Sequence, residues 1–149
     1  MTSQSAYTIK EVSKLSGLPA STLRYYEGIG IIPSIKRDPS SKQRVYNQNN
    51  LDRIDTLACL HATGLSLDDM KTYMDNIGRG KAGIRGEIEL LRSQAIRLEA
   101  ESRYLKLRKQ YVALKIQYWK AAEIDDEKEI ERIGSEARQL SKALKLPLE

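Results

Sequence analysis

The chain has 149 residues, with 25 Lys and Arg against 20 Asp and Glu, a formal charge of +5, one Cys and one His. This length holds one domain with an extension or two small units, and the lone Cys and His exclude an internal disulfide and disfavour a metal site, so no cofactor is expected. No apolar run approaches the roughly 20 residues that span a bilayer, and the first residues lack a signal pattern, so we expect a cytoplasmic protein without a membrane partner.

Residues 8–28 are predicted to form two short helices joined by a tight turn. Thr8 and Glu11 fit a capping box, in which each side chain accepts a free backbone N–H at the start of the first helix. Gly17 ends that helix, and Pro19, which has no N–H to donate, is tolerated where the second begins. The turn is then three or four residues long, as a helix-turn-helix requires.

The two helices present different faces. Ile9, Val12 and Leu15 are predicted to share the inward face of the first helix, and Leu23 faces inward on the second. The outer arc of the second helix then offers hydroxyl, guanidinium and phenol groups, which suit contacts to DNA phosphates and base edges. These candidate DNA-binding residues are Thr22, Arg24, Tyr25 and Tyr26. For the last of them, packing inside the small domain is an equally good interpretation.

Positive charge is concentrated at the start of the chain. Residues 1–53 carry eight Lys and Arg against four acidic residues, whereas residues 54–80 carry two against four. Cationic side chains release counterions from DNA and supply most of its sequence-independent affinity. The basic excess therefore lies on the segment that is predicted to meet DNA.

Residues 34–46 are predicted to form a hairpin, with arms 35–37 and 44–46 joined by the polar, Pro-containing loop 38–43. Such a hairpin beside a helix-turn-helix is a wing. Candidates for phosphate contact on it are Arg37, Lys42 and Arg44. Tyr46 is expected to pack the wing onto the body of the domain, and direct contact with DNA is an equally good interpretation.

A third helix is predicted to start among residues 47–50 and to run to His61, where Gly64 stops the helical pattern. Its inward residues, at helical spacing, are Leu51, Ile54, Leu57 and Ala58. His61 is expected to be a polar residue near the helix end.

A fourth helix is predicted to begin at a capping box formed by Ser66 and Asp69. Its inward residues are Leu67, Met70 and either Tyr73 or Met74. The glycines of residues 78–83 then predict a hinge, which ends a first domain at residues 1–80.

From residue 84 onward, steps of four and three residues alternate along a predicted long helix. The positions of this seam are Ile84, Ile88, Leu91, Ala95, Leu98, Ser102, Leu105, Lys109, Val112, Ile116 and Trp119. Nine of these eleven are apolar, which is typical of a coiled coil. At about 1.5 Å per residue the helix extends roughly 50 Å, too far to be buried in a small domain. We therefore expect residues 81–123 to dimerise with a second copy about a two-fold axis.

A second apolar stripe on this helix is displaced around its axis from the seam. It consists of Tyr104, Leu107, Tyr111, Leu114 and Tyr118. The last helix, from about Asp126 to Leu144 within residues 124–149, is expected to cover this stripe in its own chain or the partner's. The predicted fold is mainly α: a winged helix-turn-helix DNA-binding domain, a long antiparallel coiled-coil dimerisation helix and a C-terminal helix.

The first half of the chain resembles the mercury-resistance regulator (MerR) family of bacterial transcription factors. The resemblance is carried by Tyr7 to Ile32, by Arg37, Arg44 and Tyr46, and by residues 51–54 and 64–70. It implies a homodimer on an inverted repeat in promoter DNA, between the two elements that RNA polymerase recognises. The activated form would bend and untwist the DNA so that these elements realign. By analogy with the family Lys71 would contact a phosphate, although a solvated lysine is the more frequent case.

Cys59, on the third helix, has two interpretations. A small sulfur residue is often a filler of the core. However, residues 56–66 resemble the branch of the MerR family that responds to aldehydes, related electrophiles or nitrosative stress, whose lone cysteine lies at this place. Such sensing needs an accessible thiolate, and the sequence shows no activating group beside it. Both interpretations stay open here.

Other functions are weighed against a DNA-distorting regulator. Catalysis has no support, because the sequence shows no nucleophile–base pair, phosphate-cradling glycine loop or carboxylate dyad. A DNA-architectural or recombination-accessory protein could use a similar winged module, and an interaction protein could use the coiled coil as a scaffold. A regulator could also hold a small hydrophobic ligand between the second apolar stripe and the last helix.

Overall fold

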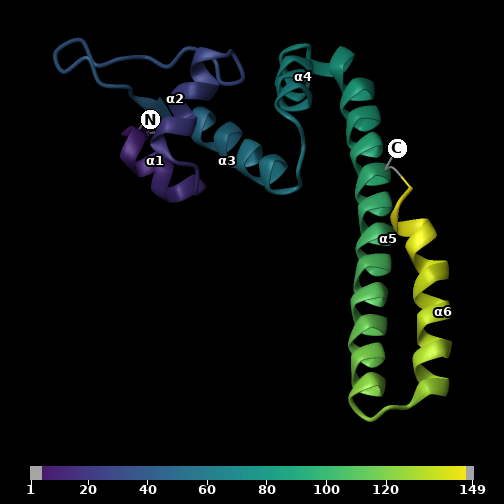
Figure 1. The fold of residues 1–149 in the computed structure, drawn as a ribbon. Helices are drawn as coiled ribbons and strands as arrows, with labels where there is room; N and C mark the ends of the chain where they lie inside the picture. The colour runs from purple at the N-terminus through teal and green to yellow at the C-terminus, as the bar shows by residue number, and fades with distance from the viewer. Residues whose placement is uncertain (1–4, 147–149) are drawn as a thin grey trace. The chain divides into compact units, whose positions relative to one another are not determined.

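The computed structural model describes residues 5–146 and is mainly helical, as predicted (Figure 1). It divides into two compact units, Met1–Leu91 and Arg92–Glu149. The elements in chain order are β1 (Ala6–Tyr7), α1 (Ile9–Ser16), α2 (Ala20–Gly28), β2 (Tyr46–Asn47), α3 (Gln48–Ala62), α4 (Leu67–Gly78), the 3₁₀ turn η1 (Gly80–Gly83), α5 (Ile84–Glu123) and α6 (Glu127–Leu144).

The first two helices begin and end where the sequence predicts. The Glu11 N–H donates to the Thr8 hydroxyl and the Thr8 N–H to the Glu11 carboxylate, each over 3.1 Å, so the capping box is confirmed. Gly17 ends α1 in the left-handed conformation with φ of 80°, which glycine adopts without steric cost. Leu23 is fully buried on α2.

The prediction for Leu15 was wrong, because its side chain is 59% exposed. Residues three apart on a helix fall about 60° short of a full turn, so two such steps carry Leu15 away from the face of Ile9. Val12, between them, is the residue of α1 that is fully buried.

A short antiparallel sheet joins the start of the chain to the end of the wing. Ala6 pairs with Asn47 and Tyr7 with Tyr46. The sequence analysis missed this sheet, because two-residue strands are too short to show an alternating pattern. The pairing brings the aromatic ring of Tyr46 into the core, where it is 1% exposed, so its predicted packing role is confirmed.

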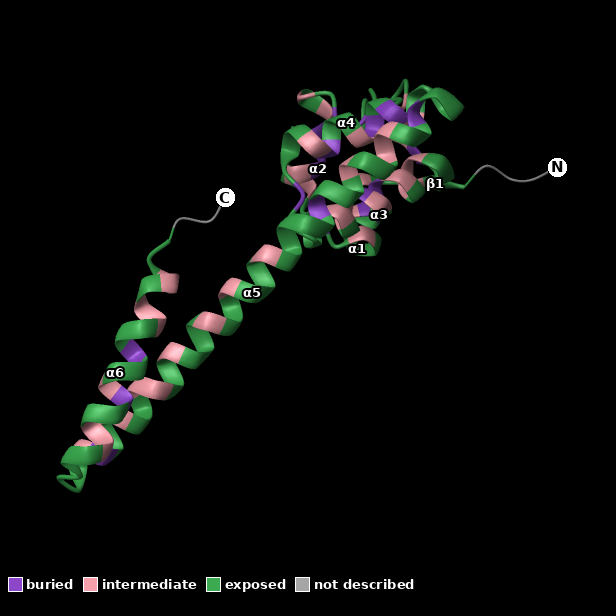
Figure 2. Cartoon of the chain, turned by 90° about the vertical axis from the view of Figure 1, so that its right-hand side faces the viewer, coloured by how far each residue is buried: buried purple, intermediate pink, exposed green. Residues whose placement is uncertain are grey.

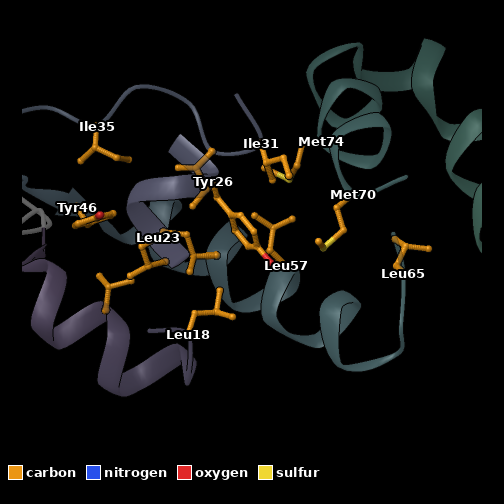
Figure 3. Close-up of a cluster of buried hydrophobic side chains, with 13 residues drawn as sticks. Leu18, Leu23, Tyr26, Ile31, Ile35, Tyr46, Leu57, Leu65, Met70 and Met74 are labelled. Carbon is orange, nitrogen blue, oxygen red and sulfur yellow. The ribbon is translucent and has the colours of Figure 1, made fainter. Parts of the chain in front are cut away.

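Helices α1 to α4 and the wing enclose the core of the first unit (Figure 3). Figure 3 shows Tyr26 among Ile31 and Leu57, while Met70 of α4 lies near Leu65. The prediction that Leu67 faces inward was wrong, since 40% of its surface is exposed. Leu67 is the first residue of α4, where no preceding turn of the helix covers it.

The corner between α4 and α5 is closely packed within the first unit. Its glycines were predicted to form a hinge, but Gly83 is buried and a Cβ added there would lie 2.0 Å from the backbone oxygen of Asn76. The Asn76 side chain, 7% exposed, donates a 2.9 Å hydrogen bond to the Glu87 carboxylate. Backbone contact and a polar anchor therefore close this corner.

The second unit is a helical hairpin formed by the later part of α5 and by α6, which lie side by side (Figures 1 and 2). Asp126 caps α6, as predicted, by accepting the Glu129 N–H over 3.2 Å. Ile133 and Ala137 of α6 are buried, and the Tyr104 hydroxyl donates to the Leu144 carbonyl over 3.4 Å. The last helix thus covers the second apolar stripe within its own chain.

In the part of the chain from residue 5 to residue 146, no helix is both long and apolar enough to cross a membrane. Nor do those residues include a group of three or more His, Cys, Asp or Glu side chains placed to hold a metal ion.

Candidate nucleic-acid interface

The wing is a narrow hairpin whose turn is organised by Asp38. Arg37 and Arg44 form an antiparallel bridge, and the Val45 N–H donates to the Lys36 carbonyl over 2.7 Å. In the turn one oxygen of the Asp38 carboxylate accepts three hydrogen bonds, from the N–H groups of residues 40 and 41 and from a serine hydroxyl. The predicted hairpin therefore forms, with its tip fixed by a charged acceptor.

These hydrogen bonds, first among them that from the Ser41 N–H, lower the pKa of Asp38 to about 2. The unfolded chain has the ordinary Asp pKa of about 3.9. The carboxylate therefore stabilises the turn fully above that value, and its contribution is lost as the pH falls through about 2. We expect the Ser41 amide resonance to keep its position at pH 3 in an NMR titration. In Asp38→Asn the low-pH transition should be absent, and an Asp38 carboxyl that titrates near 4 would contradict the assignment.

Two arginines of the wing are held by protein groups. The Nε of Arg44 donates to the Glu27 carboxylate over 3.0 Å, and both side chains are only one-sixth exposed. The Arg37 guanidinium donates to the Lys42 carbonyl across the turn over 3.0 Å. The first contact joins the wing to α2, and the second closes the wing on itself. Both side chains are thereby held in fixed positions before any ligand binds.

A groove of about 460 Å³ lies between the first turn of α1, the outer face of α2 and the wing. It gathers the predicted cations of the helix-turn-helix and the wing in one place. Its lining residues are Thr8, Ile9, Lys10, Arg24, Arg37, Lys42, Gln43 and Arg44. Five of these eight are cationic, an arrangement that suits the phosphates of a nucleic acid backbone.

Lys10 is the cation of this groove that the sequence analysis did not single out. It is exposed in the first turn of α1, next to the capping box. The position of Lys10 in its helix did not mark it as a site residue, since an exposed lysine is common in a short helix. The start of α1 meets the wing only in the folded domain, and this juxtaposition adds Lys10 to the candidate site.

The other predicted residues of α2, Thr22, Tyr25 and Tyr26, lie outside the basic groove. Thr22 and the 54% exposed Tyr25 line a second, mainly apolar hollow of about 550 Å³. Tyr26 is 2% exposed, so its ring packs in the core. Burial raises the pKa of the Tyr26 phenol, and the neighbouring Tyr25 adds to the effect.

The remaining candidates lie on α3 and α4. Lys71 is exposed on α4, and it lies outside the basic groove. Cys59 is an exposed free thiol on α3, so the interpretation as a core filler was wrong. The pattern predicted the helix correctly, but Cys59 lies two residues beyond the fully buried Leu57 and so faces another side.

Comparison with known proteins gives concordant matches. The family model "MerR HTH family regulatory protein" matches residues 7–77. The HTH-type transcriptional regulator AdhR of Bacillus subtilis (strain 168) is 33% identical over 90 residues, which are 60% of this chain and 64% of AdhR. The chain thus spans slightly less than two-thirds of that relative.

Two solved structures are similar over most of the chain. One is HiNmlR, a MerR family regulator lacking the sensor domain, bound to promoter DNA: it is 26% identical with a TM-score of 0.64, over 80% of this chain and 94% of HiNmlR. The other, a putative MerR family transcriptional regulator from Listeria monocytogenes, is 29% identical with a TM-score of 0.67, over 87% of this chain and 98% of that one. These relatives are transcriptional regulators rather than enzymes.

Proposed function

Because the chain belongs to the MerR family of helix-turn-helix regulators and is a DNA-binding transcriptional regulator, we propose that it acts as a homodimer on an inverted repeat in promoter DNA. The observation that carries this proposal is the basic groove between α1, α2 and the wing. Each protomer would place its α2 in a major groove and its wing along the flanking backbone.

The proposed contacts divide by chemistry. Phosphate contacts come from Lys10, Arg24, Arg37, Lys42 and Arg44, which line the basic groove. The exposed Tyr25 and the half-buried Thr22 of α2 would reach base edges or sugars. Tyr26 supports α2 from the core, and Lys71 is kept as an outlying phosphate contact by analogy with the family. This division assigns affinity to the groove and sequence preference to α2.

The proposed dimer uses the apolar seam of α5. Its residues are exposed in the single chain, including Leu98 at 40%, Leu105 at 47% and Ile116 at 52%. Figure 2 shows that much of the surface of α5 is exposed. The α6 helix covers the other stripe and leaves this one open. A continuous apolar seam along a 40-residue helix is typical of a coiled coil, and a second copy presents the same seam.

Charge favours the antiparallel arrangement of the two α5 helices. Residues 103–120 carry six Lys and Arg and no acid, whereas residues 84–102 carry four Glu and three Arg. A parallel pair would place the two cationic halves against each other. An antiparallel pair places each cationic half against a slightly acidic one, which relieves the repulsion.

The proposed action is distortion of the DNA between the promoter elements recognised by RNA polymerase. Smoothly bending a site of 20 to 30 base pairs by about 40–90° costs of order 1–6 kcal/mol, and untwisting adds to this cost. Two basic grooves, one on each protomer of the proposed dimer, would supply phosphate contacts at both ends of the site to offset this cost. HiNmlR has been solved bound to promoter DNA, which supports the same class of target for this chain.

The test is selection of bound duplexes from a random DNA pool at moderate salt, followed by sequencing. We expect an inverted repeat with a fixed central spacing. The matched control is Arg24→Ala, which should enrich no repeat under the same conditions. Retention of DNA without a consensus would favour a DNA-architectural or recombination-accessory protein. Absence of any retention would contradict DNA binding and leave the coiled coil as the functional part.

We further propose that Cys59 senses electrophiles, as its exposure allows. Alkylation or oxidation of the thiol would alter the surface of α3 and shift the DNA-binding domain. Cys59→Ser is expected to abolish electrophile-induced transcription from the selected promoter while leaving DNA affinity unchanged, as measured by a reporter and by titration of labelled DNA. A fully inducible Ser variant would contradict the proposal.

A second kind of effector is favoured by a groove of about 660 Å³ between α5 and α6. Leu114, Leu140 and two alanines form its apolar lining, and three glutamines contribute polar groups. If Cys59→Ser remains inducible, a small hydrophobic ligand in this groove becomes the leading hypothesis for regulation.

A further inference from the structure

An acidic residue stands where electrostatics disfavours it. Glu27 lies in the last turn of α2, at the negative end of the helix dipole, which destabilises an acidic side chain there. It also contacts Arg44, which lines the basic groove that would receive phosphates, so its charge opposes the approach of DNA. A carboxylate with these two unfavourable interactions needs a specific contact that offsets their free-energy cost.

That contact is the ion pair with Arg44. The Glu27 carboxylate accepts the Arg44 Nε over 3.0 Å, with the side chains 16% and 17% exposed. Because the pair is largely shielded from water, its geometry is better defined than that of an exposed ion pair. It links α2 to the wing across 17 residues of sequence.

The Arg44 atom that Glu27 engages determines which N–H donors of the guanidinium remain for a ligand. A guanidinium has five N–H donors in a rigid plane, one on Nε and four on the terminal nitrogens. In the described part of the chain, Nε is the Arg44 atom that donates to a protein acceptor. The terminal nitrogens remain for an acceptor outside the protein, and Arg44 lines the groove beside Arg24 and Arg37.

We propose that Glu27 is a positioning residue for DNA binding, and the inference rests on the proposed DNA-binding function. It fixes the Arg44 guanidinium with its terminal nitrogens toward a backbone phosphate. It also sets the spacing between α2 in the major groove and the wing on the backbone. One carboxylate thus aligns the two DNA-contacting parts of the domain.

The sign of one substitution separates this role from a general charge effect. Removing an acid from a surface that faces a polyanion should strengthen DNA binding if only net charge counts. Loss of a positioning contact should weaken binding, because Arg44 then has to be ordered when DNA binds. Glu27→Ala therefore gives opposite results under the two explanations.

The experiment titrates the full chain and its variants against the duplex selected above, over a series of salt concentrations. Glu27→Ala is expected to bind about tenfold more weakly, as for the loss of one well-placed charged hydrogen bond. The slope of log affinity against log salt should fall by about one for each half-site, as it should for Arg44→Ala. The double variant should bind no more weakly than Arg44→Ala alone. Asp55→Asn, an exposed acid on α3, is the matched charge control and should keep the wild-type slope.

A purely structural role would lower the melting temperature and leave the salt slope unchanged at a temperature where the variant is folded. Three results would overturn the inference: a lower melting temperature with an unchanged salt slope, tighter DNA binding by Glu27→Ala, or losses of affinity that add up in the double variant. If Glu27→Ala fails to fold, Glu27→Gln keeps an acceptor oxygen for the Arg44 Nε–H, so its affinity and salt slope should stay near the wild-type values, whereas a general charge effect would tighten binding. Failure of the wild type to bind any duplex would instead contradict the proposed function itself.

Discussion

Leu98→Asp is expected to dissociate the proposed dimer, raising its dissociation constant by about a thousandfold, because an unpaired charge buried in the seam is strongly destabilising. The Leu98 side chain is 40% exposed in the single chain and lies at the middle of the seam. In an antiparallel pair with its two-fold axis near Ser102, Leu98 faces Leu105 of the second copy. One substitution then introduces a charge into two equivalent layers.

Sedimentation equilibrium measures the dissociation constant of the dimer. Titration of the selected duplex measures how dissociation changes the affinity for DNA. A monomer binds one half-site at a time and loses the effective concentration that couples the two, so affinity for the inverted repeat should fall in parallel. Ser93→Asp, on the opposite, exposed side of α5, is the matched control and should stay dimeric. A Leu98→Asp variant that remains a dimer at micromolar concentration would contradict the role of the seam.

Cysteine cross-linking in a Cys59→Ser background tests the orientation of the same pair. Ser102→Cys should form an intermolecular disulfide in either orientation, since a disulfide needs Cβ atoms within about 4.5 Å. Ile88→Cys alone should cross-link only in a parallel pair. The double variant that combines Ile88→Cys with Ile116→Cys should cross-link in an antiparallel pair. Cross-linking of the single Ile88→Cys variant would argue against the antiparallel arrangement.

Gly83→Ala is expected to lower the free energy of unfolding of the first unit by about 2 to 3 kcal/mol, which is in the range for overpacking a buried site. The added Cβ would lie 2.0 Å from the Asn76 oxygen and 2.9 Å from its Cα, and both atoms belong to the backbone. No side-chain rotation relieves this contact, so α4 and the start of α5 have to separate. Urea unfolding followed by circular dichroism measures the loss.

Gly78→Ala is the matched control from the same corner. No heavy atom lies within 4 Å of a Cβ built there, and Gly78 is part of α4. Alanine in a helix is favoured over glycine by about 0.5–1 kcal/mol. Unfolding of this variant should therefore need the same or more urea. Equal effects of the two substitutions would show that the corner is looser than its contacts indicate.

Some features of the fold were predicted from the sequence because their causes are local. The predicted capping box at Thr8, the predicted cap at Asp126 and the cap that Ser66 gives the Asp69 N–H join groups three residues apart, so a short stretch of sequence contains both partners. The structure adds a capping box at Asn47 that was not predicted. The Asn47 cap confirms the predicted start of α3 among residues 47–50. The seam of α5 follows in the same way from helical periodicity. For the candidate site, chain order alone placed Arg24 on α2 and Arg37 and Arg44 on the wing.

The tertiary structure decided which of these side chains meet and which way each one faces. It brought Lys10 into the groove with the wing, paired Glu27 with Arg44, and placed Gly83 against Asn76. It also buried Tyr26 and left Cys59 exposed. Each of these outcomes depends on how separate elements pack, and periodicity along one element carries no information about its neighbours. The sequence by itself indicated the helices and the resemblance to the MerR family, whereas packing determined the geometry of the site.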